Sequence, residues 1–177
     1  MSEFRRYIVL LFCLLTGCAR IPDSYAPPVQ RNPLTATETE GAGHFVNMGE
    51  PNSDTYIIRD VTDSVEGGTW RWTRKRPELR FFLESTEQLN FKADIAISEV
   101  TLKDTGPVAV SVLINGHLLD TLHAAEPGVK QIDKPVPPSF LRAKTFNVVV
   151  MEIDKAWVAK DDGAILGFIL IRAGFTQ

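Results

Sequence analysis

The chain has 177 residues, 44% of them hydrophobic and 23% charged, which is a composition typical of globular proteins and unlike that of a disordered chain. Its formal net charge of −3 argues against general nucleic-acid binding. The length predicts one domain with one hydrophobic core.

The N-terminal segment MSEFRRYIVLLFCLLTGC has the layout of a secretory signal. A pair of arginines precedes an apolar run over residues 7–15, which is too short to span a bilayer as a helix. The sequence LTGC at its end resembles the lipobox of bacterial lipoproteins, in which a small residue precedes the cysteine that becomes the new N-terminus. We therefore expect a signal peptide over residues 1–17 and a membrane anchor of several acyl chains on Cys18. The alternative is an ordinary cleaved signal that ends near a cysteine.

The residues after the signal predict a tether. Ala19 follows the cysteine, where the lipoprotein resemblance associates aspartate with inner-membrane retention, so the cell envelope with anchoring in the outer membrane is favoured. Removal of residues 1–17 leaves 17 basic and 21 acidic residues, a net charge of −4, and no cysteine pair for a disulfide. Residues 18–44 hold four prolines and almost no periodic apolar pattern, so they predict a lipidated tether ahead of a folded domain over residues 45–177.

The rest of the chain predicts short strands at regular spacing and no helix. Residues 91–98 alternate apolar and polar, which indicates a strand with one buried face. Asn115-Gly116 separates two apolar runs and predicts a hairpin with a type I′ turn. The remaining expected strands are 56–61, 69–74, 78–83, 108–114, 117–122, 129–133, 146–153 and 165–171. About nine antiparallel strands predict an all-β fold, a β-sandwich of the jelly-roll kind.

Parts of this pattern are similar to a known family. The run VAVSVLINGHLLDTL, then Gly128, then PVPPSFLRAKTFNVVVMEID, resembles the galactose-binding-like jelly roll, as do WRWT and ILGFIL near the two ends. The resemblance covers roughly residues 55–175. It implies a non-catalytic domain like the carbohydrate-binding modules that accompany bacterial enzymes acting on glycans. It transfers no binding residue, because such modules bind sugars through variable loops.

Motifs for catalysis are absent from the sequence: it has no GxSxG elbow, HExxH pair, phosphate loop or CxxC, so we expect no enzyme activity. Asp154, Asp161 and Asp162 bracket the connection DKAWVAKDDG. Several carboxylates in one loop suit a structural calcium ion of the kind seen in related jelly rolls. The same residues are also common in ordinary hairpin connections, and no other cofactor is expected.

Two further features are candidate ligand contacts. Trp157 lies in that connection and either meets a sugar or protein partner or covers an open end of the sandwich. Arg71, Arg74 and Arg76 lie in a basic run that either meets anionic groups on envelope glycans or forms a solvated turn.

The stretch WRWTR alternates aromatic and basic side chains. Trp70 and Trp72 share one face of a strand, and Arg71 takes the other. Because large aromatic rings gain most from burial, we predict that the tryptophan pair is core and that Arg71 is surface. In the opposite assignment the tryptophans form a ligand platform.

These features together predict a lipid-anchored, non-catalytic envelope module that binds a glycan or a protein partner. The alternative is a structural or assembly lipoprotein of a membrane-bound complex, such as one that handles polysaccharide. A glycan-active hydrolase or lyase is the third reading, since catalytic residues can gather from separate loops without a local motif.

Overall fold

The computed structural model describes residues 41–177, so the predicted signal peptide, Cys18 and the tether up to residue 40 lie outside the described residues. From residue 41 onward no helix is long and apolar enough to cross a membrane. The folded part already includes the residues just before Phe45. Ala42 is buried, and the Gly43 N–H donates to the hydroxyl of Tyr56 at 2.9 Å.

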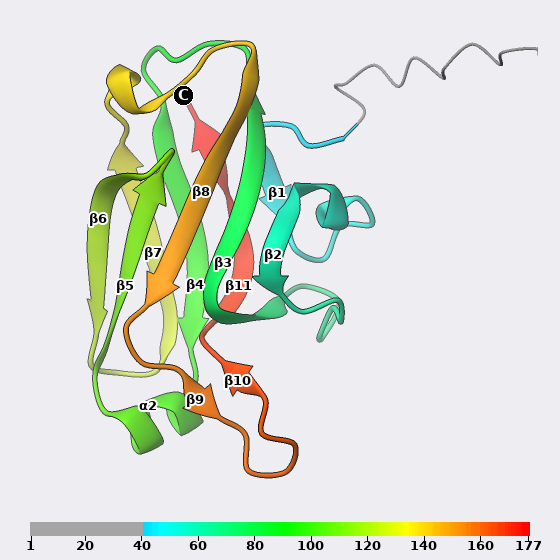
Figure 1. Cartoon of the computed structure of the whole chain (residues 1–177), viewed down its shortest axis with the longest axis vertical. Helices are drawn as coiled ribbons and strands as arrows, with labels where there is room; N and C mark the ends of the chain where they lie inside the picture. Colours follow the sequence, from blue (N-terminus) through cyan, green and yellow to red (C-terminus); the bar gives the residue numbers. More distant parts are fainter. Residues whose placement is uncertain (1–40) are drawn as a thin grey trace, which may run out of the picture. The chain divides into compact units, whose positions relative to one another are not determined.

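Residues 41–177 form an antiparallel β-sandwich with one short α-helix (Figure 1). The strands are β1 (Phe45–Asn47), β2 (Ile57–Val61), β3 (Arg71–Leu83), β4 (Asn90–Ile97), β5 (Val108–Ile114), β6 (His117–Ala124), β7 (Gly128–Pro135), β8 (Thr145–Ile153), β9 (Trp157–Val158), β10 (Ile165–Leu166) and β11 (Ile169–Thr176). The helix is α2 (Glu99–Thr105), and the 3-10 turns are η1 (Ser53–Tyr56) and η2 (Pro138–Phe140). The predicted all-β antiparallel sandwich is confirmed.

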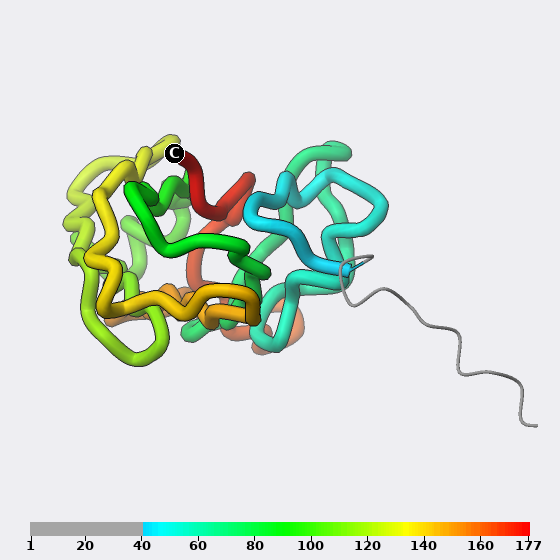
Figure 2. Tube along the Cα trace, turned by 90° about the horizontal axis from the view of Figure 1, so that it is seen from above, coloured from blue at the N-terminus to red at the C-terminus, as the bar shows by residue number. Residues whose placement is uncertain are grey.

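The strands run in the order β6-β5-β8-β3-β11-β4-β7, with β1 on β11 and β2 on β3. Strand β3 joins the two layers, because its first residues pair with β11 and its last residues pair with β8. The open edges β6 and β7 come close enough for Lys134 and Asp120 to form an ion pair at 3.1 Å. Seen from the end that carries the C-terminus, the yellow-green β6 and β7 lie on the side away from the cyan N-terminal segment (Figure 2). The sheet is therefore nearly closed.

The core lies between the two layers and is built by period-two alternation. In β4 the odd-numbered residues from Phe91 to Ile97 are all buried, and in β5 the even-numbered residues from Val108 to Ile114 are buried. Three rings meet in the core, with Phe175 in edge-on contact with Phe81 and Phe91 at 5.6 Å. The alternation that the sequence shows in residues 91–98 is thus the alternation between core and solvent.

Strand β3 is one strand of 13 residues, where the sequence predicted two. Pro77 lies inside it, beside irregularities in the pairing with β2, where proline's missing N–H is tolerated. Buried positions in β3 are odd-numbered, from Leu83 back to Arg71, with Lys75 the exception. The inward face set by Leu79 and Leu83 therefore includes Arg71 and excludes both tryptophans.

The prediction that Arg71 is a surface residue was wrong. Its side chain is 4% exposed and donates to the carbonyls of Met48, Thr62 and Asp63 at 3.2–3.4 Å. It also donates to Ser53 Oγ at 2.9 Å. These contacts fasten the loops on either side of β2 to β3, since a guanidinium offers five donors in a fixed plane.

The tryptophan pair was assigned to the wrong face as well. Trp70 and Trp72 are half-buried and meet edge to face, with ring centroids 6.0 Å apart. They share a face, as their spacing predicts, but it is the outer one, because the inner face of β3 is fixed by its longer apolar half.

The Asn115-Gly116 turn is confirmed, with φ of 48° and 86° at the two residues. Asn115 also connects the turn to η2 and to the start of β8. Its amide donates to Phe140 O at 2.8 Å and to Asn147 Oδ1 at 2.7 Å, and its Oδ1 accepts from Val148 N–H at 3.0 Å. This turn is thus held by tertiary hydrogen bonds as well as by its local geometry.

Helix α2 and the segment 165–171 also differ from the sequence prediction. Helix α2 was not expected; it begins after Ser98, whose Oγ accepts the N–H of Val100, and ends at Gly106 with φ of 69°. The expected strand 165–171 is divided into β10 and β11 at Gly167. A Cβ at Gly167 would collide with the backbone of Arg74, so this residue lets two chain segments approach closely.

Candidate functional site

The basic run does not form one surface cluster. Arg71 points into the protein, as described above, whereas Arg74 is exposed. Arg76 is half-exposed, and its Nε lies 3.4 Å from Glu152 Oε2 on β8. The sequence grouped three arginines as ligand contacts, but the structure separates Arg71 from the other two and gives it a structural role.

Trp157 lies half-buried in β9, at the end of the sandwich opposite the C-terminus (Figure 1). Its Nε1–H donates to Asp104 Oδ2 on α2 at 2.9 Å. This hydrogen bond joins the β9–β10 hairpin to the helix, and it occupies the one donor that an indole has.

Two of the three aspartates proposed for calcium, Asp154 and Asp162, accept backbone hydrogen bonds in the connection between β8 and β10. Asp154 Oδ1 accepts the N–H groups of Ala109 and Lys155 at 2.8 and 2.9 Å. Asp162 Oδ1 accepts the N–H of Ala164 at 2.9 Å, as turn residues do, and Asp161 is exposed. Within residues 41–177 no three acidic, histidine or cysteine side chains lie together in a way that could hold a metal ion.

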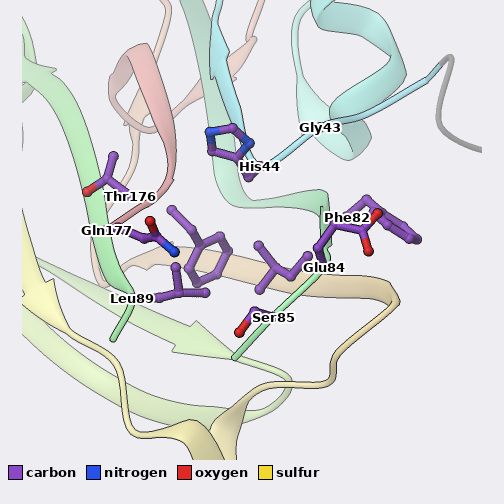
Figure 3. A pocket seen from close by; sticks show the side chains of 10 residues that line it. Gly43, His44, Phe82, Glu84, Ser85, Leu89, Thr176 and Gln177 are labelled. Carbon is purple, nitrogen blue, oxygen red and sulfur yellow. The ribbon is translucent and has the colours of Figure 1, made fainter. Parts of the chain in front are cut away.

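A pocket of about 500 Å³ opens at the end of the sandwich that carries the C-terminus (Figure 3). We call it the apical pocket. Its lining residues are Gly43, His44, Phe82, Leu83, Glu84, Ser85, Leu89, Phe175, Thr176 and Gln177. Two backbone hydrogen bonds fix its walls: Phe82 N–H donates to Gly43 O at 3.1 Å, and Phe175 N–H donates to His44 O at 2.7 Å. The pocket is therefore formed where the entry to β1 and the ends of β3 and β11 meet.

The apical pocket combines an apolar floor with a polar rim. Leu83, Leu89 and Phe175 are buried core side chains that form the floor. Figure 3 shows Leu89 and Gln177 on one side of the hollow, with Ser85 facing them. A ligand with an apolar face and several hydroxyl groups would bury its apolar face on the floor and exchange hydrogen bonds with the hydroxyl and amide at the rim.

A second hollow, of about 340 Å³, lies on the outer face of β1, β11, β4 and β7. We call it the sheet-face groove. Its lining residues are Phe45, Lys92, Asp94, Gln131, Ile132, Asp133, Arg172 and Thr176. Cross-strand register places Asp94 between Gln131 and Arg172, and places Lys92 between Asp133 and Gly174. Four neighbouring strands thus contribute one polar surface.

The charges in the sheet-face groove are paired. Arg172 Nε donates to Asp94 Oδ2 at 2.7 Å, and Lys92 Nζ lies 3.1 Å from Asp133 Oδ2. Hydrogen bonds from Asn90 and Lys92 hold the pKa of the Asp133 carboxyl below its ordinary value. Because two cations face two anions, the groove carries no net charge.

Sequence reasoning found neither hollow. The apical pocket gathers residues 43–44, 82–85, 89 and 175–177, which only the strand pairing brings together. The sequence does indicate part of the sheet-face groove, since Lys92 and Asp94 occupy the polar positions of an alternating strand. That pattern predicts a solvent-exposed face but does not show which strands lie beside it. Neither hollow is lined by Trp157 or by an arginine of the basic run.

No family model and no curated protein matches this sequence. Among solved structures, the chain is similar to a family 35 carbohydrate-binding module from an environmental isolate, with 13% identity over 69% of this chain and 82% of that one and a TM-score of 0.40. It is also similar to Xyl-CBM35 in complex with a glucuronic acid containing disaccharide, with 10% identity, coverage of 76% and 94%, and a TM-score of 0.45. A third similar structure is the carbohydrate-binding module CBM36 in complex with calcium and xylotriose, with 11% identity, coverage of 75% and 98%, and a TM-score of 0.40. At these values the likeness transfers no site residue and no ligand to this chain.

Proposed function

We propose that this protein is a lipid-anchored, non-catalytic module of the bacterial cell envelope that binds a glycan in the apical pocket. The observation that carries the proposal is the pocket's form: a hollow of about 500 Å³ with an apolar floor and hydrogen-bonding groups at the rim. Small-molecule sites usually have volumes of roughly 300–1,000 Å³ and the same division between apolar lining and a few polar groups. A sugar ring matches this lining, since it presents C–H faces and hydroxyl groups together.

The anchor and the tether belong to the same proposal. Lipid on Cys18 and the proline-containing segment up to residue 40 would hold the domain at the outer membrane while letting it reach glycans nearby. A holding role fits the pocket's chemistry, because its apolar floor can bury part of a ligand while the side chains at its rim, Glu84 among them, offer hydrogen bonds.

The test is to fill the pocket without removing core side chains. Ser85 is an exposed rim residue, so Ser85→Trp places a large ring over the hollow and leaves Leu83, Leu89 and Phe175 in place. Calorimetry of the full chain, in a detergent without a sugar headgroup, would measure binding of cellobiose, xylobiose, mannobiose and N-acetylchitobiose. We expect at least one to bind and Ser85→Trp to weaken it more than tenfold.

The matched control is Ser64→Trp, which places the same ring at an exposed position outside the pocket. We expect it to bind like the unaltered protein, with both variants melting within a few degrees of it. Equal affinity of Ser85→Trp and Ser64→Trp for a bound disaccharide would contradict the pocket as its site.

A second candidate function is docking of a protein partner, as an assembly lipoprotein would require. The opposite end of the sandwich favours it, because Val158 and Ile165 are cross-strand neighbours in the β9–β10 hairpin and are 55% and 48% exposed. Val100 on α2 is 46% exposed as well. A stoichiometric partner that co-purifies with the unaltered protein and is lost in Val158→Lys would support this function.

A further inference from the structure

The sheet-face groove has features of a ligand site that the apical pocket does not explain. It lies on the outer face of the sheet, and its two carboxylates and two cations come from three strands. Each charge already has an opposite partner inside the groove. An anion or a cation would give this balanced groove a net charge, whereas a neutral polar ligand can hydrogen-bond to the atoms that remain without doing so.

Those remaining atoms include both donors and acceptors. Arg172 uses Nε toward Asp94, which leaves its two terminal amino groups without a partner among the described residues. Asp94 accepts through Oδ2, and its Oδ1 has no donor within residues 41–177. The exposed amide of Gln131 stands beside Asp94 in the cross-strand register and adds a donor and an acceptor.

One wall of the groove is aromatic. Phe45 pairs with Gly174, and a Cβ at residue 174 would collide with the Phe45 backbone and with Cδ2 of its ring. The ring therefore leans over the glycine, beside the position of Lys92. A half-buried ring next to alternating donors and acceptors offers an apolar face and hydrogen bonds at the same time.

We infer that the sheet-face groove binds an uncharged, extended oligosaccharide as a second contact area beside the apical pocket. A hydroxyl-rich neutral chain satisfies the donors and acceptors of Arg172, Asp94 and Gln131 without adding charge to a groove whose charges are balanced. The groove crosses four adjacent strands, at about 4.8 Å per strand, so its ligand is a chain rather than a single ring. This inference rests on the proposed glycan-binding function for its ligand class alone, since its residues are separate from the pocket floor.

The experiment compares long and short probes. Calorimetry of the full chain, in a detergent without a sugar headgroup, would use the neutral cellohexaose and xylohexaose, their disaccharides, and the acidic hexagalacturonate. Arg172→Gln and Gln131→Ala each remove donors from the groove, and each should weaken binding of a neutral hexasaccharide about five- to tenfold while leaving disaccharide affinity unchanged.

Arg76→Gln is the matched control, because Arg76 has the same side-chain exposure as Arg172, 46%, and also contacts one carboxylate. It should bind both probes like the unaltered protein. In the Ser85→Trp variant the pocket is filled, so any remaining hexasaccharide binding must occur elsewhere. Loss of this remaining binding when Arg172→Gln is added would support the groove as a sugar site even if the pocket were not one.

Three results would overturn the inference. One is hexasaccharide affinity that Arg172→Gln and Gln131→Ala leave unchanged, although the disaccharide binds in the pocket. Another is tighter binding of hexagalacturonate than of either neutral chain, which would make the groove an anion site. The third is no binding of a neutral hexasaccharide at all, which would contradict the proposed function as well only if no disaccharide bound either.

Discussion

At the residue scale, Arg71 has the largest structural effect relative to what its sequence context predicts. It lies on the inner face of β3 and joins this strand to the loop carbonyls of Met48, Thr62 and Asp63. Its ion pair with Asp54 at 2.7 Å adds little, because that carboxylate is 72% exposed. The stabilising contribution of Arg71 therefore lies in hydrogen bonds to buried or half-buried groups.

Arg71→Ala should lower the free energy of unfolding by about 2–4 kcal/mol, since it leaves acceptors without donors and opens space in the interior. Arg74→Ala, at an exposed position three residues away, should change it by less than about 0.5 kcal/mol. Urea denaturation of both variants would measure the difference. Equal free energies of unfolding for Arg71→Ala and Arg74→Ala would contradict the role of Arg71 in holding the loops to β3.

At the element scale, the β5–β6 hairpin depends on the backbone of its turn. Gly116 has φ of 86°, and a Cβ there would have no heavy atom within 4 Å, so a substitution acts through backbone strain alone. Gly116→Val should cost about 1–3 kcal/mol in stability. Leu118→Val, at a 58% exposed position in the same hairpin, serves as the control in thermal melts. A melting temperature that moved in neither variant would contradict the strained turn.

Whether the sequence predicts a feature of this fold depends on how far apart along the chain the residues that determine it lie. The Asn115-Gly116 turn was predictable because its geometry is local. The inward face of Arg71 was predictable in principle, because residues two apart in a strand share a face and Arg71 is an even number of residues from the buried Phe81. Because Pro77 lies between them, the sequence predicted two strands, and the two residues were not compared. The apical pocket was not predictable, because Gly43, Leu83 and Phe175 meet only through the pairing of distant strands.

At the scale of the whole molecule, the proposed lipid anchor on Cys18 would determine where the domain acts. Cys18→Ala should leave the protein either unprocessed or soluble after cleavage, because the cysteine supplies the only predicted attachment to acyl chains. Metabolic labelling with a fatty acid would mark the unaltered protein and not the variant. An unaltered protein that is cleaved and carries no label would contradict the anchor and leave the binding domain to be judged separately.

Residue-resolved NMR of the labelled full chain would show directly whether the apical pocket is a glycan site. The probes are the four disaccharides named above. We expect the changes in amide chemical shift on binding to concentrate at residues 43–44, 82–85, 89 and 175–177, with smaller changes elsewhere. A saturating disaccharide whose shifts concentrate outside those residues, or an absence of shifts with every probe, would contradict it.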